Sequence, residues 1–165
     1  MTFERGPASD DQIGDDVVLL AATHDHEPTL AVFMRQLRED DPGEGPFDEA
    51  RCVPAMRRLI ADPSLGRMWM IDVDGRTAGY VALTLGYSIE FGGVAAVVDE
   101  LFVAREYRGK GVGTRTLRLV VGEARKMGVA VLALEVTRSN DVAKRVYAKV
   151  GFADRDHHLM TLMLS

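Results

Sequence analysis

The stretch Val97–Thr114 reads VVDELFVAREYRGKGVGT, and the rest of the chain is organised around it. It begins as an apolar run typical of a buried strand and ends in a glycine-rich, basic turn that opens an amphipathic helix. At such a turn the backbone N–H groups point outward, and the helix dipole favours a negative charge. Arg108 and Lys110 add side-chain cations. The pattern therefore predicts a binding site for a phosphate-bearing ligand.

The composition is that of an ordinary globular domain. The chain has 165 residues, of which 47% are hydrophobic and 27% charged, and this length suits a single core. Cys52 is the only cysteine, which excludes an internal disulfide and a cysteine-based metal cluster. The four histidines have no metal-like spacing, so no metal is expected. Because the apolar runs are short and residues 1–16 do not resemble a secretory signal, we expect a cytoplasmic protein without membrane contact.

Charge is distributed unevenly along the chain. Residues 1–50 hold 13 acids and three arginines, a balance of −10, whereas residues 51–165 hold 12 acids and 17 bases, a balance of +5. An acidic chain with a net charge of −5 argues against general binding of nucleic acid. Much of the basic excess surrounds the glycine turn.

Residue periodicity on either side of the opening stretch predicts the secondary structure. Helices are expected around 30–37, over 48–61, over 111–127, and after a cap at Ser139 or Asn140. Strands are expected at 17–21, 67–73, 77–85, 94–103 and 129–136, with two short stretches of strand material within 152–164. The run 129–136 is apolar throughout, as in a strand that is covered on both faces.

Turn signals join three of these strands into an antiparallel meander. Asp74-Gly75 is typical of a hairpin, Gly86 is expected to bulge the returning strand, and Gly92-Gly93 makes the next turn. The order β-α-α-β-β-β-α-β-α-β, with a further C-terminal strand, predicts an α/β domain over residues 15–165 with a single mixed, largely antiparallel central sheet flanked by helices. Residues 1–14 are expected to form a loosely ordered tail.

Two familiar phosphate-binding motifs do not fit the turn RGKGVG at 108–113. A P-loop needs four residues between its first glycine and Gly-Lys-Ser/Thr, and this spacing is absent. A dinucleotide-binding turn needs G-x-G-x-x-G inside a β-α-β unit, whereas here the preceding strand follows a meander. A third pattern, R-x-x-G-x-G, fits Arg108, Gly111 and Gly113.

With this pattern the sequence resembles the GNAT superfamily of acetyl-CoA-dependent N-acetyltransferases, in which R-x-x-G-x-G is the pyrophosphate-binding turn. A second match lies downstream, where Asn140, Ala143, Tyr147 and Gly151-Phe152 follow the family's N-x-x-A-x-x-x-Y-x-x-x-G-F signature. The order of elements agrees as well, so the resemblance covers roughly residues 15–164.

The resemblance assigns the contacts with acetyl-CoA, the acetyl donor. They fall to Leu101, Phe102, Val103, Arg108, Gly109, Lys110, Gly111, Val112, Gly113, Thr114, Asn140, Ala143 and Tyr147. In such folds a bulge splays the 94–103 strand from the 129–136 strand, and the pantetheine arm of the cofactor enters the gap. A backbone amide near Val103 would then polarise the thioester carbonyl.

The resemblance also assigns catalytic roles. Tyr147 is the candidate acid for the leaving thiolate, although an apolar-stripe tyrosine on a helix also suits a core position. Asn140 combines a cofactor contact with helix capping. For the base that deprotonates the amine, Glu100 is the preferred candidate and Asp99 the alternative. Neighbouring strand residues point to opposite faces, and a bulge would reverse which of the two faces the active site.

The acceptor is expected to be a primary amine, on a cationic small molecule of the polyamine or aminoglycoside type or on a lysine side chain. Such a cation would suit the acidic loop formed by Glu39, Asp40, Asp41, Glu44, Asp48 and Glu49, unless that loop is simply a solvated surface. Trp69, Tyr80, Tyr87 and Phe91 either line the same cleft or pack the meander. Relatives are often dimers, so a homodimer is a hypothesis. The alternative function is a non-catalytic acyl-CoA-binding or sensor domain on the same fold.

Overall fold

The computed structural model describes residues 16–41, 45–156 and 159–164. In chain order the elements are β1 (Val17–Ala21), η1 (His24–His26), α1 (Glu27–Asp40), α2 (Glu49–Ala61), β2 (Gly66–Val73), β3 (Arg76–Ser88), β4 (Gly93–Val103), η2 (Arg105–Tyr107), α3 (Val112–Lys126), β5 (Val131–Leu134) and α4 (Asp141–Val150). The tail expected at 1–14 lies outside the described residues.

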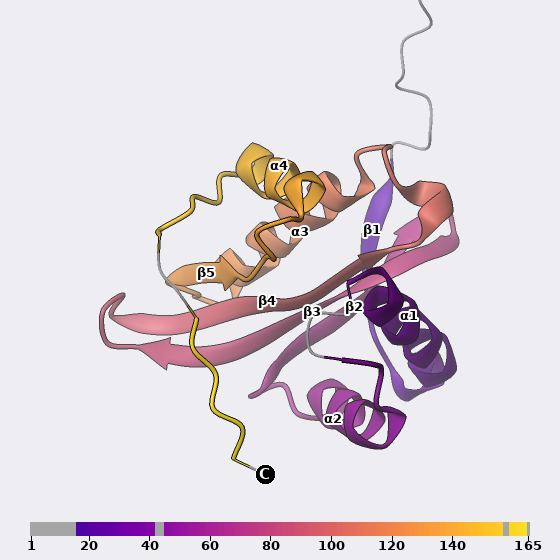
Figure 1. The fold of residues 1–165 in the computed structure, drawn as a ribbon, viewed down its shortest axis with the longest axis horizontal. Coiled ribbons are helices and arrows are strands. Elements are labelled where there is room, and N and C mark those ends of the chain that lie inside the picture. Colours follow the sequence, from indigo (N-terminus) through magenta and orange to yellow (C-terminus); the bar gives the residue numbers. More distant parts are fainter. Residues whose placement is uncertain (1–15, 42–44, 157–158, 165) are drawn as a thin grey trace, which may run out of the picture.

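The strands form one five-stranded sheet in the order β1-β2-β3-β4-β5. The β1–β2, β2–β3 and β3–β4 pairs are antiparallel, and β4 pairs with β5 in parallel. Figure 1 shows α1 and α2 on one side of this sheet and α3 and α4 on the other. The mixed, largely antiparallel sheet flanked by helices is therefore confirmed. Within the described residues, no helix has the length and apolar character needed to cross a membrane.

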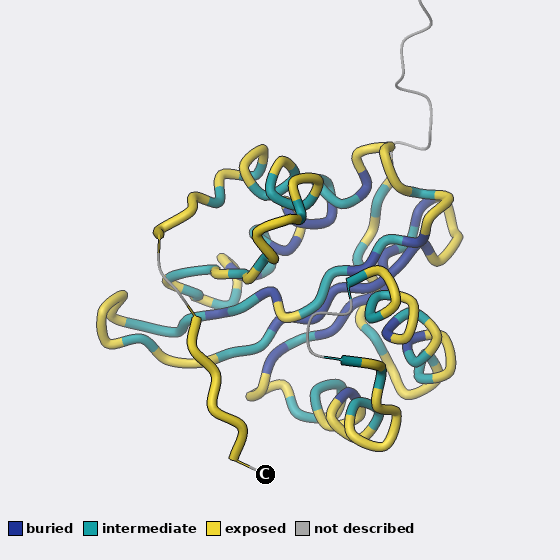
Figure 2. The backbone as a smooth tube through the Cα atoms, viewed as in Figure 1, coloured by how far each residue is buried: buried dark blue, intermediate teal, exposed yellow. Residues whose placement is uncertain are grey.

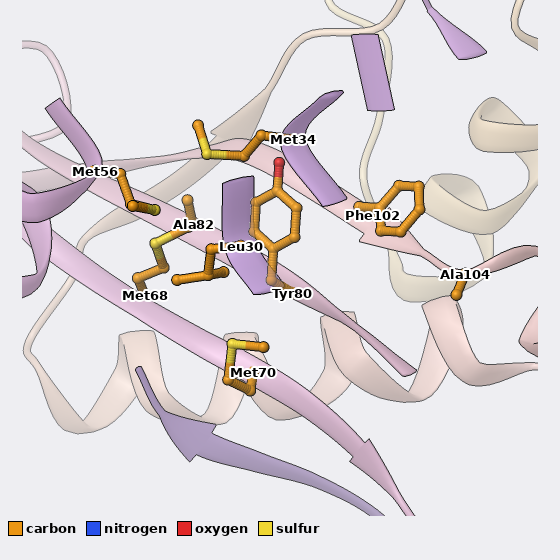
Figure 3. Close-up of a cluster of buried hydrophobic side chains, with 9 residues drawn as sticks. All are labelled: Leu30, Met34, Met56, Met68, Met70, Tyr80, Ala82, Phe102 and Ala104. Carbon is orange, nitrogen blue, oxygen red and sulfur yellow. The ribbon is translucent and has the colours of Figure 1, made fainter. Parts of the chain in front are cut away.

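Each face of the sheet carries its own core. The first, which we call the α1/α2 core, is shown in Figure 3 and contains Leu30, Met34, Met56, Met68, Met70, Tyr80, Ala82, Phe102 and Ala104. The second, the α3/α4 core, contains Trp69, Val81, Leu83, Ala96, Val98, Leu117 and Val120. A third, smaller cluster contains Ile71, Val73, Ala78 and Val112. Residues 80–83 of β3 alternate between the first two cores, as the twofold period of a strand requires. Membership of one core or the other therefore shows on which face of the sheet a strand side chain lies.

Two turn predictions have different outcomes. The hairpin turn is confirmed, since Asp74 and Gly75 have φ values of 53° and 75°, both in the left-handed region that such a two-residue turn needs. The bulge expected at Gly86 is wrong, because Gly86 pairs with Ala95 in regular register. A glycine alone does not create a bulge; one strand must contain an extra residue relative to its partner.

The C-terminal part departs from the expected pattern. The strand predicted over 129–136 is shorter, because β5 ends at Leu134, and it is not covered on both faces, since each of its residues is half-buried or exposed. It lies at the edge of the sheet and has only β4 as a partner among the described strands. The strands expected within 152–164 are also wrong for the described residues, where none is formed. Figure 2 shows residues 153–156 and 159–164 as exposed. Without a paired neighbour, an apolar run does not become a strand.

Candidate functional site

A β-bulge in β4 decides the direction of the two candidate carboxylates. Leu83 of β3 pairs with Val98, and the next residue, Ala82, pairs with Glu100, which leaves Asp99 as the extra residue. Val98 belongs to the α3/α4 core, whereas Glu100 stands opposite a residue of the α1/α2 core. Side chains of directly paired residues share a face. The bulge therefore turns Glu100 toward α1 and leaves Asp99 exposed at the bend.

The same bulge separates β4 from β5. The two strands pair only from Ala95↔Val131 to Val98↔Leu134, so the ladder stops at the residue that precedes the bulge. Beyond it, no described strand pairs with the β5-facing edge of β4. The splaying that the resemblance implied, and that no local sequence pattern reveals, is therefore present in the fold.

The backbone groups along this open edge can be identified. The N–H of Ala104 donates to the carbonyl of Ala78 at 2.8 Å, toward β3. Because successive residues of a strand alternate in direction, the backbone groups of Val103 and Leu101 point away from β3. The Val103 carbonyl accepts a hydrogen bond from Nε of Arg108 at 2.6 Å. The Val103 N–H and both polar groups of Leu101 thus lie along the open side of β4.

The glycine turn sits between η2 and α3. Gly111 is the N-cap residue of α3 with φ 77°, a left-handed conformation that favours glycine. No side chain caps this helix, so its first N–H groups depend on other partners. The side chains of Phe102 and Val112 are 2% exposed. These two predicted cofactor residues therefore offer no exposed side chain to a ligand, and the backbone groups of Phe102 point toward β3, because Phe102 lies between Leu101 and Val103 in the strand.

The cations of the turn are engaged within the protein. Nη2 of Arg108 donates to Asp40 Oδ2 at 2.5 Å, and Nη2 of Arg105 donates to Asp40 Oδ1 at 3.0 Å. Lys110 Nζ donates to the carbonyl of Glu106 at 2.6 Å. The hydrogen bond from Arg108 holds the pKa of Asp40 below its usual range. This contact ties the end of α1 to the turn, and sequence reasoning missed it because no local pattern marks a pair so far apart in the chain.

Glu100 lies in a half-buried polar cluster between β3, β4 and α1. Its carboxylate accepts a hydrogen bond from the Tyr80 hydroxyl at 2.9 Å, and the Arg38 guanidinium approaches to 4.0 Å. Burial raises the pKa of Glu100, while the Tyr80 hydrogen bond opposes that rise. Asp99 is exposed as a residue, yet the surrounding protein removes enough water from its carboxyl group to raise that pKa as well.

The second motif forms α4. Asn140 is its N-cap and accepts a hydrogen bond from the N–H of Ala143 at 3.0 Å, which confirms the capping role. Tyr147 is half-buried, packs against the α3/α4 core, and meets the Phe152 ring edge-on at 6.1 Å. Burial raises the pKa of Tyr147, and the negative charge of Asp41 adds to the rise.

The acidic loop and the aromatic residues are only partly available to a ligand. Asp40 pairs with the two arginines of the turn, Asp48 caps α2, and Glu49 accepts from Arg35 at 3.0 Å. Glu44 lies outside the described residues. Trp69 and Tyr80 are buried in opposite cores, whereas Tyr87 and Phe91 are 75% and 41% exposed near the β3–β4 turn.

Comparison with known proteins agrees with this architecture. The model of the acetyltransferase (GNAT) family matches residues 30–152. Streptothricin acetyltransferase from Streptomyces lavendulae is 34% identical over 143 residues, which are 87% of this chain and 66% of that protein. The uncharacterized N-acetyltransferase YobR from Bacillus subtilis (strain 168) is 36% identical over 90 residues, 54% of this chain and 33% of that protein.

A solved structure gives the same fold. An integron cassette protein from the mobile metagenome of Cole Harbour Salt Marsh superposes with a TM-score of 0.78 at 29% identity, covering 89% of this chain and 90% of that one. The fold and the two motifs are those of the acetyltransferase (GNAT) family, and the chain belongs to this family. It spans between 33% and 66% of the length of the curated relatives it matches.

Proposed function

We propose that this chain transfers an acetyl group from acetyl-CoA to a primary amine, by direct attack and without a covalent enzyme intermediate. The bulge at Asp99 is the observation that carries the proposal. It both ends the pairing of β4 with β5 and turns Glu100 toward α1, so that an open strand edge and a candidate base arise from one irregularity. Membership of the acetyltransferase family supports the choice of donor.

The residues present fit a coenzyme A thioester. The uncapped N-terminus of α3 beyond Gly111 would bind the pyrophosphate through backbone N–H groups. Leu101 and Val103 would pair with the pantetheine arm as a neighbouring strand does, and the Val103 N–H would polarise the thioester carbonyl. Arg108 would contribute by holding the Val103 carbonyl, which keeps the end of this strand edge in place.

Glu100 is the proposed base. An amine reaches the thioester as an ammonium ion and must lose a proton before its lone pair can attack the carbonyl carbon. An ordinary carboxylate is a weak base for this purpose, but burial raises the pKa of Glu100 and so increases its affinity for the proton. A relay through ordered water would connect the two groups. Asp99, exposed at the bulge, remains the alternative base.

Tyr147 is the proposed acid. When the carbon–sulfur bond breaks, the electron pair leaves on sulfur, and the phenol of Tyr147 would supply the proton that makes the free thiol. The pKa of Tyr147 is raised by burial, which keeps the hydroxyl protonated at neutral pH, as a general acid must be. Its packing against the α3/α4 core is compatible with this role, since only the ring needs to be buried.

We further propose that the acceptor amine is cationic and belongs either to a polyamine- or aminoglycoside-like small molecule or to a lysine side chain. Glu100 and Asp99 lie at the open edge of β4, and the carboxyl group of Asp41 acts on the Tyr147 hydroxyl from the end of α1. Acidic groups around one site raise the local concentration of cations. The name of the relative streptothricin acetyltransferase supports acetyl transfer as the reaction.

The test is an acetylation screen with a panel of amines and lysine peptides, read out as thiol release from acetyl-CoA. Turnover of at least one amine, lost in Glu100→Gln and retained in Asp99→Asn, is the expected result. Retention of the wild-type pH profile in both variants would place the base elsewhere. Acetyl-CoA binding without turnover of any amine would instead favour the alternative, a non-catalytic acyl-CoA-binding or sensor domain.

A further inference from the structure

The Tyr80 side chain occupies an unusual position for a polar group. Its ring is completely buried in the α1/α2 core (Figure 3), where it stacks on Phe33 at 6.5 Å with an interplanar angle of 7° and tilts against Phe102 at 6.2 Å. A phenylalanine would fill the same apolar space. The hydroxyl of Tyr80 therefore needs a hydrogen-bond partner, because a buried hydroxyl without one destabilises the fold.

That partner is Glu100. Tyr80 pairs directly with Phe102, and Ala82 pairs with Glu100, so Tyr80 and Glu100 are diagonal neighbours on the same face of adjacent strands. The hydroxyl donates to Oε2 of the carboxylate at 2.9 Å. If Asp99 were paired regularly instead of bulged, Glu100 would share the face of Val98, and the contact could not form.

We infer that Tyr80 is a positioning residue for Glu100, which it holds in one orientation by a hydrogen bond from a ring fixed between two aromatic neighbours. The inference rests on the proposed function, in which Glu100 is the base. Tyr80 itself does not exchange the proton, because its ring is fully buried and burial keeps its pKa well above that of an ordinary tyrosine. Its hydroxyl acts only through the carboxylate.

The hydrogen bond has a definite consequence for pH dependence. Three titratable groups act on Glu100: Tyr80 of β3, Arg38 of α1 and Asp99 of β4. Tyr80 and Arg38 stabilise the carboxylate and lower its pKa, while burial and the charge of Asp99 raise it. Removal of the Tyr80 hydroxyl takes away one of the two groups that lower the pKa of Glu100, while burial and Asp99 continue to raise it. The pKa of Glu100 should therefore rise.

The experiment compares kcat/KM between pH 5 and 9 for the wild type and Tyr80→Phe, with the best amine of the screen. Loss of a hydrogen bond to a charged group should move the acid limb of the profile upward by about one pH unit. This corresponds to roughly a tenfold loss on that limb, with KM for acetyl-CoA unchanged. Phe33→Leu is the matched control, because it disturbs the same aromatic stack and keeps both the hydroxyl and the carboxylate; it should lower Tm and move the acid limb less than Tyr80→Phe does.

Uniform incorporation of 3-fluorotyrosine provides a second measurement on a chain without substitutions. A more acidic phenol donates a stronger hydrogen bond, so the acid limb should move to lower pH, opposite to the effect of Tyr80→Phe. An unmoved limb in both cases, or an equal loss at all pH values in Tyr80→Phe and Phe33→Leu, would overturn the inference and reduce Tyr80 to packing. If Glu100→Gln keeps full activity, Glu100 is not the base, and the positioning role of Tyr80 is then wrong as well. If Glu100→Gln is inactive and the limb does not move, only the role of Tyr80 is wrong.

Discussion

Deletion of Asp99 tests whether the bulge opens the sheet. Val98 already pairs with Leu83, and Glu100 already pairs with Ala82, so removal of the intervening residue keeps every cross-strand pair of β3 and β4. Glu100 should also keep its direction. What changes is the edge that faces β5: β4 would run straight beyond Val98, and the residues after Leu134 could continue the parallel ladder beside it.

The expected magnitude follows from the groups that would be covered. The N–H and C=O of Leu101 and the N–H of Val103 lie along the open edge, whereas the Val103 carbonyl is held by Arg108. At about 1 kcal/mol for each backbone hydrogen bond, loss of these groups as partners for the pantetheine arm would weaken acetyl-CoA binding by about 3 kcal/mol. The dissociation constant should rise about 150-fold.

Isothermal titration calorimetry with acetyl-CoA measures this change, with Tm and circular dichroism as checks of folding. The matched control is Asp99→Ala, which removes the carboxyl group and keeps the extra residue; it should bind acetyl-CoA within about twofold of wild type, because exposed side chains contribute little. A folded deletion variant that binds acetyl-CoA as tightly as wild type would refute the view that the bulge creates the cofactor site.

Three further substitutions test the remaining contacts. Gly111→Glu should weaken acetyl-CoA binding at least 100-fold, because it adds bulk and negative charge at the anion turn and strains a residue with φ 77°; wild-type affinity would exclude the turn as the phosphate site. Tyr147→Phe should lower kcat by roughly 10²–10⁴-fold with little change in cofactor affinity if the phenol is the acid, and an unchanged kcat would leave it a core residue. Asp40→Asn should lower the free energy of unfolding by about 1 kcal/mol at pH 7. Because the pKa of Asp40 is lowered in the fold, this contribution is present above the ordinary aspartate pKa and lost as pH falls through the folded value, so urea unfolding of the two proteins should converge in acid. A constant difference at all pH values would contradict an ionic role for the contact with Arg108.

The glycine turn, the hairpin and the amphipathic helices could be predicted because their signals are local. Positive φ at Asp74 and Gly75 follows from the residue types themselves, and the buried stripe of α3 at Leu117, Val120 and Ala124 follows from a period of 3.6 residues. The errors share one cause. The predictions for Gly86, the 129–136 strand and the strands within 152–164 rest on local composition, whereas strand pairing depends on the neighbouring strands.

The sequence by itself predicted an anion-binding turn at 108–113, and it carries the residue pattern of the acetyltransferase (GNAT) family, whose model it matches. It left open which of Asp99 and Glu100 points toward α1. Neighbouring residues of a strand point to opposite faces, and an extra residue in a bulge reverses which of the two faces a given side. The tertiary structure turns Glu100 toward α1 through its pairing with Ala82, which makes Glu100 the preferred candidate base. It also joined Tyr80 to Glu100 and Asp40 to the turn. These contacts arise from strand register and from helix packing across the sheet, which no short window of sequence contains.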